Sequence, residues 1–209
     1  MKTDKLDIKL RPTQISDLDT LFQFQTDKEA GYLAAFMPKD PTDKVAYLIK
    51  YTKLLVEPTV NNQTIVIDNI IVGSIAKFIM DGETEITYWI DKKFWGQGIA
   101  TKALKIFVDI ENSRPIFGRV VFDNFGSQKV LEKCGFVQIG SGKGFANARQ
   151  IEIEELNINC LDKKNTLKHW FGKSGGVVPA DTFVVNQSLI FRFNLCVENH
   201  RLRQVRNRF

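Results

Sequence analysis

One stretch of the sequence, residues 83–104, limits the folds open to this chain more than any other. It begins with T-E-I-T-Y-W-I at residues 84–90, a run of β-branched and aromatic residues that is typical of a strand. W-G-Q-G-I-A-T follows at residues 95–101. Apolar residues then recur at helical spacing, at Ile99, Ala103, Leu104 and Phe107. The pattern predicts a strand, a glycine turn and a helix in direct succession.

The glycine turn, residues 95–101, has the features of an anion site. The free N–H groups and the positive end of the helix dipole converge at a helix N-terminus. The small residues Gly96, Gly98 and Ala100 would let a phosphate approach the main chain closely. The turn is not a Walker A loop and lacks the third glycine of a dinucleotide fingerprint. The alternative is a structural turn without a ligand.

Two segments resemble one known family. Residues 88–104 resemble the acetyl-CoA loop of the GNAT-type N-acetyltransferases, Gln/Arg-x-x-Gly-x-Gly/Ala. Gly98 and Ala100 match that loop, and Trp95 stands at its Gln/Arg position, which leaves the main-chain amides in place. Residues 124–136 resemble the family's Asn-x-x-Ala/Ser…Gly-Phe segment. The resemblance covers roughly residues 6–158. Within the family, the sequence looks most similar to the branch that contains the ribosomal-protein N-terminal acetyltransferases.

The resemblance implies an α/β (α+β) fold with a mixed, mostly antiparallel central sheet and helices on both faces. Two parallel strands splay apart at the CoA site. The patterns place strands at 6–11, 62–68, 71–80, 83–90, 116–123, 136–139 and 149–158. They place helices after Thr13 or Ser16, from Asp40 to about residue 55, and at 98–112 and 125–134. The expected apolar side of the helix that begins at Asp40 consists of Val45, Leu48, Ile49, Thr52 and Leu55, and the glycine-rich residues 140–144 are expected to separate the last two strands. We therefore expect a GNAT-like domain at 1–158 and a basic extension of unclear structure at 159–209.

The resemblance also implies acetyl-CoA as co-substrate, with no metal. The pyrophosphate would bind N–H groups of the glycine turn, and the pantetheine arm would pair with the main chain near Tyr88 and lie beside residue 124. Asn124 could instead serve only as a helix cap, for which asparagine is among the best residues. The expected CoA-binding residues are Trp89, Ile90, Trp95, Gly96, Gln97, Gly98, Ile99, Ala100, Thr101, Asn124 and Ser127.

Glu85 and Tyr88 are the candidate catalytic residues. Relatives often carry a glutamate at the position of Glu85, where it would act as general base; the alternative is a solvated strand residue. The family's usual general acid, a tyrosine seven residues after the asparagine, is Leu131 here. Tyr88 is the nearest substitute, although a strand tyrosine can equally be structural.

Histidines and cysteines restrict the chemistry further. Both histidines, His169 and His200, lie in the extension, so residues 1–159 cannot use Ser-His or Cys-His hydrolysis. Three widely spaced cysteines without a C-x-x-C pattern argue against a zinc site or a disulfide framework. Cys134 could be a nucleophile, but beside Gly135 it is better explained as a packed helix end. We expect a cytoplasmic protein without a membrane-spanning segment.

The partners are less constrained. Residues 30–38 are apolar and irregular, so they predict either a wall of the acceptor site or a loop packed on the core. The net charge is +6 in residues 160–209 and −1 in residues 1–159, so the basic character belongs to the extension. The extension could pack on the domain or on a second subunit, could bind nucleic acid, or could be poorly ordered.

The leading hypothesis is an N-acetyltransferase acting on the primary amine of a small molecule or a protein N-terminus by direct transfer. A CoA-binding regulatory module and a nucleic-acid-associated protein are the alternatives.

Overall fold

A computed structural model describes residues 7–161, and the extension beyond residue 161 lies outside the described residues. A seven-stranded sheet with the order β1-β2-β3-β4-β5-β7-β6 forms its centre. The strands are β1 (Ile8–Pro12), β2 (Asn61–Ile67), β3 (Ile70–Met80), β4 (Glu83–Ile90), β5 (Ile116–Val121), β6 (Val137–Ala146) and β7 (Ile151–Cys160). The helices are α1 (Leu18–Gln25), α2 (Lys28–Ala34), α3 (Lys44–Leu55), α4 (Ile99–Ile110) and α5 (Phe125–Lys133), with short 3-10 turns at Ile15–Asp17 and Lys92–Phe94.

All neighbouring strands are antiparallel except β4 and β5, which are parallel. Two tight turns build the meander of β2, β3 and β4. Asp68 and Asn69 both adopt positive φ, as do Asp81 and Gly82, and such pairs of positive-φ residues close two-residue hairpins. The mixed, mostly antiparallel sheet predicted from the sequence is confirmed.

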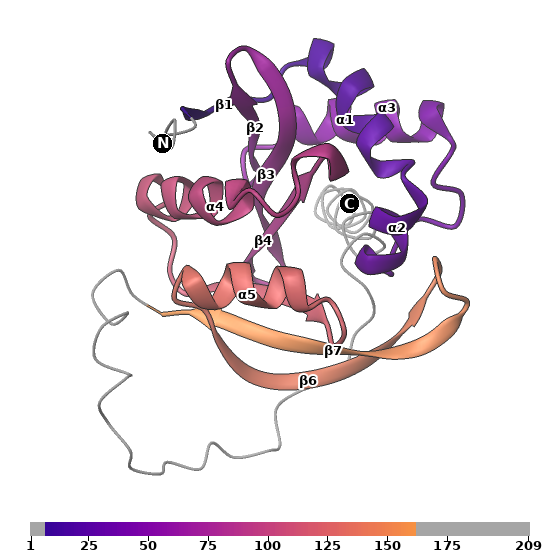
Figure 1. The fold of residues 1–209 in the computed structure, drawn as a ribbon, viewed down its shortest axis with the longest axis vertical. Coiled ribbons are helices and arrows are strands. Elements are labelled where there is room, and N and C mark those ends of the chain that lie inside the picture. The colour runs from indigo at the N-terminus through magenta and orange to yellow at the C-terminus, as the bar shows by residue number, and fades with distance from the viewer. Residues whose placement is uncertain (1–6, 162–209) are drawn as a thin grey trace, which may run out of the picture.

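Helices cover both faces of this sheet (Figure 1). Ile75 of β3 packs in one core with Ile99 and Leu104 of α4, whereas Phe78 of the same strand packs with Leu54 of α3. Because successive side chains of a strand point to opposite faces, α4 and α3 lie on opposite sides of the sheet. The α4 face is the larger core, and Leu131 places α5 on it as well.

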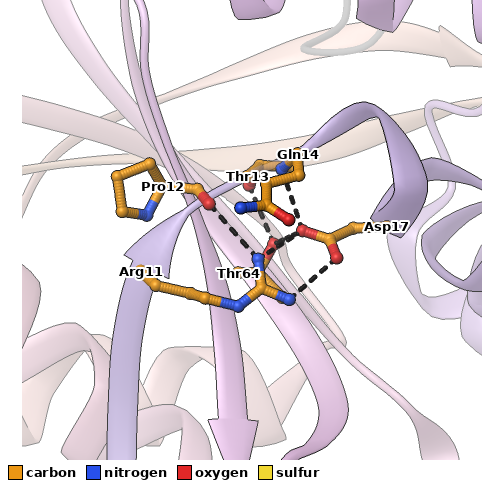
Figure 2. A network of polar contacts seen from close by, with 6 residues as sticks. All are labelled: Arg11, Pro12, Thr13, Gln14, Asp17 and Thr64. Atoms are coloured by element: carbon orange, nitrogen blue, oxygen red, sulfur yellow. Dashed lines mark hydrogen bonds and ion pairs between the residues drawn. The ribbon is translucent and has the colours of Figure 1, made fainter.

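A partly buried ion pair ties β1 to the first helical turn (Figure 2). Arg11 donates to both carboxylate oxygens of Asp17, at 2.6 and 2.8 Å. The main-chain N–H of Gln14 and the hydroxyl of Thr64 also donate to Asp17, each at 2.9 Å. Although burial opposes the charged form, the bonds from Arg11, Gln14 and Thr64 hold the pKa of Asp17 below its usual value. This network fixes where the chain leaves β1.

Residues 30–38, expected to form either a wall of the acceptor site or a loop packed on the core, contribute Ala35 and Phe36 to a second core. Residues 28–34 form α2, which the sequence patterns did not predict, and Ala35, Phe36 and Met37 are at most 3% exposed. Phe36 packs with Val121 of β5 and Ala146 of β6. Packing on the core is therefore confirmed for Ala35, Phe36 and Met37, although residues 28–34 form a helix and not a loop. A contribution of this segment to the acceptor site stays a prediction.

Two further expectations were wrong. The glycine-rich residues 140–144 do not separate two strands but belong to β6 itself, which runs alongside β7 over its whole length. In α3 the expected apolar face is misplaced, since Val45 and Ile49 are more than half exposed. Tyr47 is buried instead, because its ring packs against Phe22 and stacks on Tyr51 at 4.2 Å between centroids.

Candidate active site

The parallel strands β4 and β5 are joined at one end only. Their pairing consists of Thr84 with Ile116 and Glu85 with Phe117, whereas β4 stays paired with β3 up to Ile90. On its other side, β5 pairs with β7 over its full length. The strands therefore splay, and the β4 residues 86–90 have no strand partner on the β5 side in the described part of the chain. An extended ligand can pair with such an unpaired strand edge.

The glycine turn follows β4 after the short 3-10 turn Lys92–Phe94 and presents bare main chain. Gly96 and Gly98 have φ values of 75° and 74°, a conformation that favours glycine. A Cβ atom added to either glycine would meet no atom within 4 Å. The first helical bond of α4 runs from the N–H of Lys102 to the carbonyl of Gly98 at 3.1 Å, so the N–H groups of residues 98–101 have no acceptor within the helix. An anion in front of this turn would meet these groups and the positive end of the α4 dipole.

The side chains of the turn hold it in place. The indole of Trp95 donates to the carbonyl of Ile90 at 2.8 Å, and the amide of Gln97 donates to the carbonyl of Lys93 at 3.3 Å. Ile99 is 1% exposed and anchors the start of α4 in the core, where Ala100 also packs. Trp95 is therefore a structural anchor, and the Ile90 carbonyl, expected to face the ligand, already has a donor within the protein.

Tyr88 bridges the splay from β4 to α5. Its hydroxyl lies 2.6 Å from the hydroxyl oxygen of Ser127, in the first turn of α5. Burial raises the pKa of Tyr88, so its hydroxyl keeps its proton at neutral pH. Two residues expected at the site, one catalytic and one for CoA binding, are thus in direct contact beside the gap.

Asn124 uses both ends of its amide within the protein. Its oxygen accepts from the N–H of Ser127 at 3.1 Å and caps α5, and its nitrogen donates to the carbonyl of Leu33 at 3.2 Å. The helix-cap interpretation is confirmed, and a bond from Asn124 to a pantetheine arm stays a prediction.

Glu85 is deeply buried beside an arginine. It is 1% exposed, and one of its oxygens, Oε1, accepts from Arg119 at 2.9 and 3.2 Å. Arg119 also lies 3.5 Å from a carboxylate oxygen of Glu155. Burial raises the pKa of Glu85, although Arg119 opposes the rise. The alternative of a solvated strand residue is therefore wrong, and the role of Glu85 as general base stays a prediction.

The second oxygen of Glu85, Oε2, has no hydrogen-bond partner in residues 7–161. A buried carboxylate oxygen of this kind can still accept a proton.

Leu131 and Cys134 lie in the core of α5 and offer no acid or nucleophile. Leu131 is 4% exposed, so the position at which the family carries a tyrosine is apolar here. The thiol of Cys134 is buried and contacts the carbonyl of Thr101 at 3.5 Å. Burial raises the pKa of this thiol to about 11, which disfavours the reactive thiolate. The packing interpretation of Cys134 is confirmed.

A pocket lies on the opposite face of β4, between the sheet and helices α1 and α3. We call it the α1–α3 pocket, and it encloses about 570 Å³, its open mouth included. Trp89, expected to bind CoA, lines this pocket, and its indole donates to the carbonyl of Phe24 in α1 at 3.1 Å. The pocket residues are Gln25, Lys50, Tyr51, Asn62, Ser74, Ala76, Phe78, Thr87, Tyr88 and Trp89.

Sequence reasoning missed most of these residues. Their signal in α3 is the spacing of Tyr47, Lys50 and Tyr51, which share one helix face. On β3, Ser74, Ala76 and Phe78 alternate along one strand face, which places them beside Thr87 and Trp89 of β4. A pocket assembled from five separate segments has no local sequence signature.

The described residues contain no cluster of histidine, cysteine and acidic side chains that could hold a metal ion. None of the helices within residues 7–161 is both long and apolar enough to cross a membrane.

Comparison with known proteins agrees with this geometry. Residues 7–137 match the family model described as "Acetyltransferase (GNAT) domain". The chain belongs to the GNAT acetyltransferase family. It is therefore an acyltransferase that uses acetyl-CoA as its co-substrate.

Individual relatives are distant. An uncharacterized N-acetyltransferase p20 of Bacillus licheniformis is 24% identical over 167 residues, which cover 75% of this chain and 94% of that protein. The ribosomal-protein-S5-alanine acetyltransferase of Vibrio fischeri has a TM-score of 0.62 at 20% identity, covering 77% of this chain and 96% of that one. The spermidine N-acetyltransferase of Vibrio cholerae, solved with CoA and spermine, has a TM-score of 0.64 at 19% identity, covering 75% and 96%. Both solved structures share the fold of this GNAT protein.

Proposed function

We propose that this GNAT protein binds acetyl-CoA at the glycine turn and the splay, and transfers the acetyl group directly to a primary amine held in the α1–α3 pocket. One observation supports the proposal above all. The glycine turn follows the β4 segment that has lost its β5 partner, and the same segment, through Thr87, Tyr88 and Trp89, lines the pocket. A donor in the gap and an acceptor in the pocket would therefore meet at β4.

Direct transfer requires positioning more than covalent help. The amine nitrogen attacks the thioester carbonyl, the carbon–sulfur bond breaks, and CoA leaves as a thiolate while the amine loses its proton. Holding both reactants in attack geometry removes much of the entropic barrier of a bimolecular reaction. The N–H groups of residues 98–101 would hold the pyrophosphate, and the unpaired edge of β4 would align the pantetheine arm.

Tyr88 would stabilise the leaving thiolate. Its hydroxyl lies beside the splay, is held by Ser127 at 2.6 Å, and remains protonated because burial raises its pKa. A hydrogen bond aimed at charge that develops in the transition state is worth more than one made equally in the ground state. Tyr88 would thus take the role that Leu131 cannot perform.

Glu85 would receive the proton of the amine through water. It lies two residues from Thr87 on the same strand face, next to Phe78, so it borders the pocket. Its raised pKa and its free Oε2 support this role, and its burial opposes it. Arg119 would limit the rise in pKa and keep Glu85 ionised.

The acceptor would be a small amine or a protein N-terminus, as in the ribosomal-protein branch that the sequence resembles. The two solved neighbours carry different acceptors in their names, an alanine of ribosomal protein S5 and spermidine. The pocket lining of this chain is the better guide to its acceptor.

A thermal-shift titration with acetyl-CoA, CoA and ATP tests CoA binding. A ligand that binds only the native state raises the melting temperature by mass action. We expect a rise with acetyl-CoA and CoA and none with ATP. No rise with either CoA species would leave the glycine turn as a structural turn. Thiol release with a panel of amines then separates an enzyme from the alternative, a CoA-binding regulatory module without turnover.

Replacing Tyr88 by phenylalanine tests the proposed acid. Loss of one hydrogen-bond donor to the leaving group should lower kcat roughly tenfold to a hundredfold, with the KM for acetyl-CoA little changed. Ser127→Ala serves as the matched control, because it removes only the partner that orients the Tyr88 hydroxyl. The decrease in kcat should be smaller for Ser127→Ala than for Tyr88→Phe. An unchanged kcat for Tyr88→Phe would remove this tyrosine from the mechanism.

A further inference from the structure

The α1–α3 pocket has an unusual balance of charge for a site that would receive an amine. Among its ten described lining residues none is acidic, and the one charged side chain is Lys50. Three of the others, Tyr51, Phe78 and Trp89, are aromatic side chains that face the pocket, whereas the Tyr88 side chain points to the opposite face of β4. The remaining polar residues, Gln25, Asn62, Ser74 and Thr87, carry only neutral hydrogen-bonding groups. The lining can orient a ligand, but it offers no carboxylate to an ammonium group.

The aromatic walls are held in fixed positions. The indole of Trp89 is bonded to the carbonyl of Phe24 at 3.1 Å. The ring of Tyr51 stacks on Tyr47 at an interplanar angle of 30°, and its hydroxyl accepts from the amide of Gln25 at 3.3 Å. Rings that are already ordered bind a flat ligand with little further loss of side-chain entropy. The pocket therefore favours a ligand with a planar face.

Lys50 sets the sign of the charge in the α1–α3 pocket. Its ammonium lies 5.4 Å from the centre of the Tyr51 ring, and burial lowers its pKa to about 8, so a substantial fraction of these lysines still carries a positive charge at neutral pH. Glu85 is an acidic residue that borders the pocket, because it lies opposite Phe78 across β3 and β4. Its charge is countered by Arg119 at 2.9 Å. A ligand that brings several ammonium groups would thus meet a like charge at Lys50, and the bordering carboxylate, Glu85, is already paired with Arg119.

We propose that the acceptor is a monoamine with a flat aromatic or unsaturated body, and that polyamines are poor acceptors. The proposal rests on the proposed function, because it names the substrate class of that acetyl-transfer site. The reacting amine loses its proton on attack, so the pocket need not hold its positive charge. A carboxylate elsewhere on the same acceptor is compatible with Lys50, whereas a second ammonium is not.

Two commercially available amines form the test pair. Tyramine carries one ammonium group on a two-carbon chain attached to a flat ring, and spermidine carries three ammonium groups on a flexible chain. With the full chain and saturating acetyl-CoA, release of CoA should give a kcat/KM at least tenfold higher for tyramine. Binding is measured separately as the rise in melting temperature that each amine causes in the presence of CoA, where tyramine should again exceed spermidine.

Lys50→Glu tests whether the lysine sets this preference. Reversing the charge at the wall should shift the ratio of the two kcat/KM values towards spermidine by at least tenfold. Lys53→Glu makes the same change of charge at an exposed position of the same helix and should leave the ratio unchanged. The conservative variant Lys50→Arg should keep the preference for tyramine.

The outcomes separate the two proposals. Equal use of the two amines, or a ratio that Lys50→Glu does not move, would overturn the substrate class while leaving acetyl transfer intact. So would a protein that still binds acetyl-CoA but neither binds nor acetylates tyramine. If acetyl-CoA itself fails to raise the melting temperature, the proposed function fails, and the substrate class, which rests on it, falls too.

Discussion

Replacing Gly98 by alanine separates the strain of the glycine turn from its proposed role in binding CoA. Gly98 has a φ of 74°, and an added Cβ would meet no atom within 4 Å. The cost to folding is therefore that of an L-residue in the left-handed region, about 1–2 kcal/mol, without a clash to add. For a chain of this size each kcal/mol corresponds to about 2–4 °C in melting temperature. We expect the variant to melt about 2–8 °C below the wild type.

Gly82→Ala is the matched control. Gly82 has a φ of 86°, also has no atom within 4 Å of an added Cβ, and lies in the hairpin between β3 and β4. Both variants should lose similar stability, but only at Gly98 does the new methyl group stand in front of the N–H groups of α4. We expect acetyl-CoA to bind Gly98→Ala at least tenfold more weakly, a difference of about 1.4 kcal/mol or more.

The assay is the rise in melting temperature caused by acetyl-CoA at one hundred times the wild-type Kd. There the ligand stabilises the wild type by about 2.7 kcal/mol, and a tenfold weaker variant by about 1.4 kcal/mol. The ligand-induced shift of Gly98→Ala should therefore be about half that of the wild type and of Gly82→Ala. The same full shift in all three proteins would refute the assignment of this turn to the pyrophosphate.

Three further predictions address the fold and the base. Asp17→Asn should lower the free energy of unfolding, measured by urea denaturation, by about 2–3 kcal/mol. This loss is smaller than that expected on breaking a fully buried ion pair, because the Arg11 side chain is 38% exposed. Since the pKa of Asp17 is lowered in the native state, its stabilisation is present above about pH 4 and is lost as the pH falls through the lowered pKa, a loss that the variant should not show. Glu85→Gln, compared with wild type at equal folded fraction, should lower kcat strongly while acetyl-CoA still binds. An unchanged turnover would mean that Glu85 is not the general base and only contacts Arg119 as a structural residue. Gly144→Ala should destabilise the protein by about 1–3 kcal/mol in thermal melts, because the new Cβ would lie 3.0 Å from the Phe36 ring; an unchanged melting temperature would mean that the ring moves aside freely.

Local chemistry explains which parts of the fold the sequence could predict. The path from β4 through the glycine turn into α4 depends on neighbouring residues, and its two glycines adopt the positive φ that their type permits. The cap at Asn124 is local in the same way, because its bond to Ser127 spans three residues. These elements could be predicted with their boundaries correct to within one or two residues.

Long-range packing explains the rest. The inward face of α3 follows from a tilted ring contact between Phe22 and Tyr47, residues 25 positions apart, so hydropathy alone selected the wrong side of the helix. The sequence left open the alternative that Glu85 is a solvated strand residue, because Arg119, its partner, lies 34 positions away in β5. The segment at residues 30–38 is held in place by long-range hydrogen bonds. Asn147 donates to the carbonyl of Met37 and Arg149 donates to the carbonyl of Tyr32. None of these contacts leaves a trace in a short window of sequence.

Only two residue pairs join β4 to β5, so the sheet consists of two blocks of strands, β1-β2-β3-β4 and β5-β7-β6. Each block keeps its own complete antiparallel ladders, so widening the gap between the blocks breaks no strand pairing in either. An extended ligand lying in that gap would form main-chain hydrogen bonds with β4 that no strand forms there, and would act as an additional strand. The cosubstrate would then serve as a structural member of the sheet, and each round of product release would take that member away.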